Sequence, residues 1–125
     1  MQENEISSNI LNCSIKVHRN LGPGLFESVY EEVLCFELKK LGLNYERQIG
    51  IPVIYEGVKM ELGFRADIIV EDKVIVELKS VEAINPVHKK QLLTYLKITG
   101  KKLGLLINFN ESLLKDGITR VVNNL

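Results

Sequence analysis

Residues 64–79 read Phe-Arg-Ala-Asp-Ile-Ile-Val-Glu-Asp-Lys-Val-Ile-Val-Glu-Leu-Lys, which is two apolar segments on either side of a polar turn. Both segments are rich in β-branched residues, a composition that is typical of strands. The pattern predicts a β-hairpin whose loop is residues 71–73. A loop of that length pairs Val70 with Val74, and this pairing fixes the register of the two strands.

Three ionisable residues, Asp67, Glu77 and Lys79, interrupt this apolar hairpin. In the predicted register Asp67 lies opposite Glu77, and the alternation of strand side chains places Lys79 on the same face. Two facing carboxylates destabilise a sheet, and burying them is costly unless a cation offsets their charge. Two interpretations stay open from spacing alone: a site for Mg²⁺ or Mn²⁺, which favour oxygen ligands, and a cross-strand ion pair on a solvated face.

The composition is that of an ordinary globular protein. The 125 residues, 46% of them hydrophobic, fit one domain spanning residues 1–125. Lys and Arg together number 16, as do Asp and Glu, which argues against a domain that holds nucleic acid by net charge alone. The sequence contains neither a signal peptide nor an apolar run that could span a membrane, so we expect a cytoplasmic protein in which Cys13 and Cys35 are buried free thiols.

The hydrophobic periodicity predicts a mixed α/β domain. Apolar residues recur with helical spacing in three segments, at 6–21, 25–41 and 86–99. Extended segments are expected at 45–55, at 58–62 running on into the hairpin, at 103–108 and at 117–122. Pro52 places its segment at an edge of the sheet or at a bulge. The expected order is therefore α-α-β-β-β-α-β with a short tail.

Other polar residues could join the hairpin carboxylates. Glu27 lies in the first turn of the second helix, where the helix dipole favours a carboxylate with or without a function. Gln91 and Tyr95 share one face of the third helix and could bind phosphate oxygens or a metal-bound water, although a surface amide and a half-buried phenol are ordinary features. Basic residues near this helix could form a phosphate-facing patch or a solvated face: His88, Lys89, Lys90, Lys97, Lys101 and Lys102.

These residues together resemble a known family pattern. Asp67 followed by Glu77-Leu-Lys79 resembles the D…(D/E)xK core of the PD-(D/E)xK nuclease superfamily, and Gln91-xxx-Tyr95 resembles the QxxxY element of its RecB-like branch. The segment Gly24-Leu-Phe-Glu-Ser-Val-Tyr30 matches the pattern of the GxxExxY proteins, a group placed in that superfamily. One departure is Ala66, which stands where the superfamily's name has proline, at a position that varies among its members.

The resemblance implies a single restriction-endonuclease-like domain, an αβββαβ core with an extra N-terminal helix. It implies a metal-dependent nuclease, using Mg²⁺ or Mn²⁺, that hydrolyses phosphodiester bonds of DNA, with RNA the less favoured substrate. The metal ligands that the resemblance implies are Asp67, Glu77, Glu27 and the Leu78 carbonyl. The catalytic residues that it implies are Glu27, Asp67, Glu77, Lys79, Gln91 and Tyr95. The alternative is a non-catalytic nucleic-acid-binding or regulatory module that retains the fold. Under either function the chain could act as a homodimer or with a protein partner.

Overall fold

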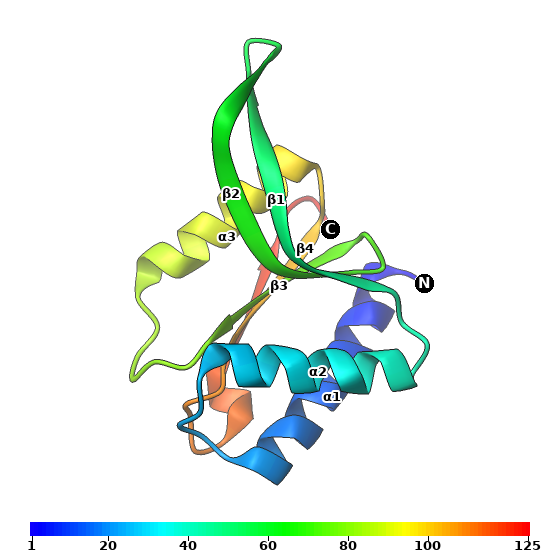
Figure 1. The fold of residues 1–125 in the computed structure, drawn as a ribbon, viewed down its shortest axis with the longest axis vertical. Helices are drawn as coiled ribbons and strands as arrows, with labels where there is room; N and C mark the ends of the chain where they lie inside the picture. The colour runs from blue at the N-terminus through cyan, green and yellow to red at the C-terminus, as the bar shows by residue number, and fades with distance from the viewer.

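The computed structural model describes residues 1–125 and shows helices packed on both faces of a five-stranded sheet (Figure 1). The helices are α1 (Glu3–Leu21), α2 (Glu27–Lys40) and α3 (Pro86–Thr99). The strands are β1 (Tyr45–Tyr55), β2 (Val58–Val70), β3 (Val74–Lys79), β4 (Leu103–Asn108) and β5 (Ile118–Val122), with a 3₁₀ turn η1 (Leu114–Gly117) before the last. This order confirms the predicted succession of elements, including the additional helix at the N-terminus. None of the helices combines the length and the hydropathy needed to cross a bilayer.

The sheet is mixed, as expected. Its strands lie in the order β1-β2-β3-β4-β5, and neighbouring strands are antiparallel except for β3 and β4, which run parallel. Parallel neighbours need a long crossover, and here α3 lies within it. This crossover brings α3 onto the sheet beside the end of β3.

Two hydrophobic cores cover the two faces of the sheet. Helices α1 and α2 lie on one face and α3 on the other (Figure 1). The alternation of β3 divides its side chains, because Val76 and Leu78 belong to the larger core with α1 and α2, whereas Ile75 packs against Leu92 and Leu96 of α3. Each such apolar side chain contributes about 1.5–3 kcal/mol when fully buried. The ionisable residues of β3 therefore face α3.

The predicted hairpin register is confirmed. Val70 pairs with Val74 and Ile68 with Val76, so the next position outward places residue 67 opposite residue 77. The turn between the strands is tight, and Glu71 and Asp72 both adopt positive φ angles.

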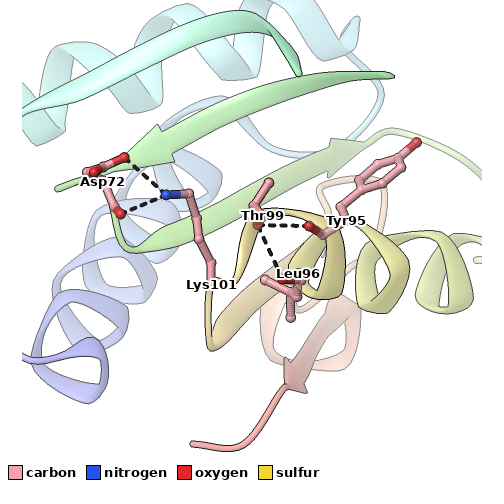
Figure 2. A network of polar contacts seen from close by, with 5 residues as sticks. All are labelled: Asp72, Tyr95, Leu96, Thr99 and Lys101. Atoms are coloured by element: carbon pink, nitrogen blue, oxygen red, sulfur yellow. Dashed lines mark hydrogen bonds and ion pairs between the residues drawn. The ribbon is translucent and has the colours of Figure 1, made fainter. Parts of the chain in front are cut away.

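Lys101 fastens this turn to the loop between α3 and β4. Figure 2 shows the Lys101 ammonium between two oxygens of Asp72, 2.9 Å from its backbone carbonyl and 3.0 Å from Oδ1. The Thr99 hydroxyl donates to the Tyr95 and Leu96 carbonyls in the last turn of α3 (Figure 2). The Lys101 ammonium is thus bound to the turn at Asp72.

The β1–β2 hairpin continues beyond the rest of the sheet as a projecting arm (Figure 1). The register of β1 against β2 shifts between Pro52 and Ile54, which confirms the predicted edge position with a bulge. Gly63 pairs with Pro52 at this irregularity, and a Cβ atom there would lie 2.1 Å from the Ile51 carbonyl oxygen. The close approach of the two backbones therefore requires glycine.

We expect Gly63→Ala to lower the free energy of unfolding by about 3 kcal/mol, because the methyl group would displace backbone atoms that cannot rotate away. Gly50→Ala on the same arm is the matched control, since its added Cβ would meet no atom within 4 Å. Urea unfolding of both variants measures the difference. Equal stability of the two would contradict the close approach.

Candidate active site

Asp67 and Glu77 are linked where the β2–β3 ladder ends. The Leu78 amide donates a hydrogen bond to Asp67 Oδ2 at 2.8 Å, and the Asp67 amide donates to Glu77 Oε2 at 3.3 Å. Each carboxylate thus accepts a hydrogen bond from a backbone amide of the opposite strand. These bonds replace the next pair of backbone hydrogen bonds between β2 and β3. The arrangement holds the two acidic groups together on the face that packs against α3.

Glu77 is held in an environment that disfavours its charge. Its Oε1 atom is sealed from solvent and has no hydrogen-bond partner. Burial, and then the negative charge of Asp67, raise the pKa of Glu77 to about 9. A buried carboxylate with an orphaned oxygen is costly for stability, so this group needs either a proton or a cation.

The end of β3 carries Lys79 and is anchored by β4. The Phe109 amide donates to the Lys79 carbonyl at 2.9 Å. The Asn108 side chain accepts from the Val81 amide at 3.1 Å and donates to the Val81 carbonyl at 2.9 Å. Asn108 is itself fully buried. These bonds fix the backbone from Lys79 to Val81, and the lysine shares its sheet face with Glu77.

The loop between α1 and α2, which contains Gly22-Pro23-Gly24, brings the start of α2 to the same strand end. The Tyr30 hydroxyl donates to the Gly22 carbonyl at 2.5 Å and accepts from the Leu25 amide at 3.2 Å. Ser80 binds both the loop and the start of α2, since its hydroxyl donates to the Leu25 carbonyl at 2.7 Å and its amide to Glu27 Oε2 at 3.2 Å. Glu27 is consequently placed at the C-terminal end of β3.

Helix α3 contributes the opposite wall. His88, Gln91 and Tyr95 follow one another at spacings of three and four, so they lie along one face of the helix. The Tyr95 ring stacks on Phe64 with centroids 3.8 Å apart, and burial, with the charges of Glu77 and then Asp67, raises the pKa of its phenol. His88 Nδ1 is buried without a partner.

A cavity of about 140 Å³ lies between these elements. It is lined by all six predicted catalytic residues, Glu27, Asp67, Glu77, Lys79, Gln91 and Tyr95, and also by Arg65, His88, Leu92 and Leu106. Larger cavities of about 400 and 430 Å³ lie on the β1–β2 arm and beside α1, but neither contains paired carboxylates. The structure thus brings the predicted residues to one small polar cavity.

The sequence interpretation missed or undervalued three residues near this cavity. Arg65 stands two positions before Asp67, a spacing that places both on one strand face and could have identified it. His88 was counted only among the basic residues, although it lies three positions before Gln91. Gln48, which donates to Asp67 Oδ1 at 3.4 Å, comes from β1 and has no local sequence signal.

The chemistry of the donors fits a small divalent cation. The structure contains no group of three or more His, Cys, Asp or Glu side chains arranged around a metal position. Magnesium, however, is commonly held by one or two carboxylates together with waters and substrate phosphates. Asp67 and Glu77 supply such a pair, and the orphaned Glu77 Oε1 is an unused ligand atom. The Leu78 carbonyl and Glu27 remain predicted ligands.

Comparison with protein families also indicates a site for a divalent metal ion. A family model described as the PD-(D/E)XK nuclease superfamily matches residues 4–121. The chain belongs to this superfamily. The matched range includes every residue that lines the cavity, and PD-(D/E)XK nucleases generally use divalent metal ions. No curated protein matches the sequence.

Solved structures similar to this PD-(D/E)XK chain include a crystal structure of SSO0001, with 23% identity and a TM-score of 0.52. The match covers 79% of this chain and 51% of SSO0001, so the chain spans about half the length of that protein. An alkaline exonuclease (LHK-Exo) from Laribacter hongkongensis is 13% identical over 98% of this chain and 83% of the exonuclease, with a TM-score of 0.48. With the family match, the mixed sheet flanked by helices confirms the predicted restriction-endonuclease-like fold.

Proposed function

We propose that this chain is a metal-dependent nuclease that hydrolyses phosphodiester bonds of DNA, and that residues 1–125 form a single domain of the GxxExxY group. The observation that carries the proposal is the partly buried pair Asp67 and Glu77, with an orphaned, buried oxygen on Glu77, in one cavity with Lys79. Membership of the PD-(D/E)XK superfamily supports nucleic acid as the substrate. The balanced charge of the chain favours a second copy or a partner as a further source of binding surface.

The roles follow from position and chemistry. Asp67 and Glu77 would hold Mg²⁺ or Mn²⁺, with Glu27 and the Leu78 carbonyl as the remaining predicted ligands. When bound, such an ion polarises a phosphate and lowers the pKa of a coordinated water. Lys79 orients the attacking water and offsets the negative charge that develops on the phosphate oxygens.

The reaction is an in-line displacement at phosphorus. A water oxygen bonds to phosphorus while the bond from phosphorus to the leaving sugar oxygen breaks. The attacking water gives one proton to solvent, and the leaving oxygen takes one proton from solvent to become a hydroxyl. Gln91 and Tyr95 line the wall facing the carboxylates and donate hydrogen bonds to phosphate oxygens. Arg65 and His88 add a cationic and an imidazole donor to the same cavity.

The test is cleavage of supercoiled plasmid, single-stranded DNA and RNA with Mg²⁺, with Mn²⁺ and with chelator. We expect wild-type protein to cut DNA only with the metal, and Asp67→Ala to lose this activity. Ser112→Ala, an exposed change beside η1 and away from the cavity, should retain it.

Equal cleavage by wild type and Asp67→Ala would identify a contaminant and contradict the proposal. Nucleic-acid binding that survives both chelation and Glu77→Ala, without any cleavage, would favour the non-catalytic module. Cleavage of RNA in preference to DNA would revise the substrate and leave the chemistry intact.

A further inference from the structure

Gln48 has an unusual backbone conformation in the middle of β1. Its φ angle is +49°, although it is not glycine and the ladder to β2 continues on both sides, with Arg47 opposite Ile68 and Ile49 opposite Ala66. Left-handed backbone is strained for a residue with a side chain, and such strain persists where the surroundings demand it. We therefore expect contacts of the Gln48 side chain to stabilise this backbone conformation.

The Gln48 side chain bridges two acidic residues from different elements. Its Nε2 atom donates to Glu31 Oε1 at 2.6 Å and lies 3.4 Å from Asp67 Oδ1. Glu31 is buried on α2, and its other oxygen is held by the Arg47 guanidinium through Nε at 3.1 Å and Nη2 at 3.0 Å. The Gln48 amide thus connects buried Glu31 on α2 to the carboxylate of Asp67, which lines the cavity.

We infer that Gln48 is a positioning residue that holds the Asp67 carboxylate in its metal-binding orientation, with buried Glu31 as its anchor. Asp67 Oδ2 is already fixed by the Leu78 amide, and Gln48 restrains the other oxygen, so rotation of the carboxylate is restrained from both sides. Hydrogen bonds from such supporting residues orient metal ligands and contribute to metal affinity. This inference rests on the proposed function, because it concerns the metal that Asp67 would bind.

The experiment measures Mn²⁺ binding to the full chain by isothermal titration calorimetry. We expect Gln48→Gly to bind Mn²⁺ about tenfold more weakly than wild type, since glycine accepts the positive φ but removes the amide. Glu56→Gly is the matched control: Glu56 also has a positive φ, of +51°, but lies in the β1–β2 turn. It should bind Mn²⁺ as wild type does.

Two further variants make the result decisive. Asn adopts left-handed backbone readily but is too short to span Glu31 and Asp67, so Gln48→Asn should lose the same affinity even if the glycine variant unfolds. Glu31→Ala should also weaken binding, and combining it with Gln48→Gly should add little, because both changes break one connection.

If the wild type binds Mn²⁺ and the folded Gln48→Asn variant binds it with the same affinity, the positioning role of Gln48 is overturned. The proposed metal-dependent function would still stand. Failure of the wild type to bind Mn²⁺ at all would overturn both the inference and the proposed metal-dependent function. Equal losses in Glu56→Gly and Gln48→Gly would assign the effect to backbone flexibility and would also overturn the positioning role.

Discussion

Glu77→Gln is expected to raise the free energy of unfolding of the metal-free protein by about 3 kcal/mol at pH 7. The pKa of Glu77 in the folded protein is raised to about 9 from an ordinary value of 4.5, first by burial and then by Asp67. Folding at pH 7 therefore requires the carboxyl to take up a proton, and this cost is absent for the neutral amide. Because the folded pKa is the higher one, wild-type stability should fall as the pH rises from about 4.5 towards 9.

Urea unfolding in chelator at pH 5 and at pH 8 measures this effect. The advantage of Glu77→Gln should be below about 1 kcal/mol at pH 5 and largest at pH 8. Glu61→Gln, an exposed change on the β1–β2 arm, is the control and should show no such trend. The same Glu77→Gln protein should lose metal binding and cleavage. If the difference in free energy of unfolding between Glu77→Gln and wild type were the same at pH 5 and pH 8, this would contradict the raised pKa of Glu77.

Lys79→Met should lower kcat for DNA cleavage by about 10²- to 10³-fold while leaving Mn²⁺ affinity within about twofold of wild type. Lys79 shares a cavity with Asp67 and Glu77, so its ammonium can offset the charge that develops on phosphate in the transition state. Methionine keeps the length and packing of the side chain and removes only the cation.

Single-turnover cleavage, combined with calorimetric titration of Mn²⁺, separates these two effects. Lys102→Met is the matched control, because Lys102 is exposed and lies between α3 and β4, outside the cavity lining. Its cleavage rate should stay near the wild-type value. An equal loss of rate in both variants would indicate a general electrostatic contribution to DNA binding in place of a specific role for Lys79.

Local signals predicted most of the fold. Helical periodicity located the three α-helices, because each buries one apolar face. Short segments rich in apolar and β-branched residues located the strands, including β4, which is buried at all six positions and shows no alternation. The turn of residues 71–73 between β-branched segments was sufficient to fix the register, and with it the juxtaposition of Asp67 and Glu77. The pattern resemblance then indicated that Glu27 and Gln91 lie near them, although neither has a specific signal alone.

Contacts between distant elements could not be predicted in this way. The bridge from Glu31 through Gln48 to Asp67 depends on a left-handed residue in a strand, which no propensity favours for glutamine. Lys101 looked like one of several surface lysines until the fold brought the turn at Asp72 beside it. Such contacts depend on how the layers pack, and packing is not encoded in any single window of sequence.

The most direct measurement is anomalous scattering from a crystal of the protein soaked in Mn²⁺. We predict a peak between Asp67 and Glu77, about 2.0–2.2 Å from a carboxylate oxygen of each, with Glu77 Oε1 among the ligands. A crystal that shows no peak at this position at millimolar Mn²⁺, or only peaks at exposed carboxylates elsewhere, would contradict a metal-dependent site built on this pair.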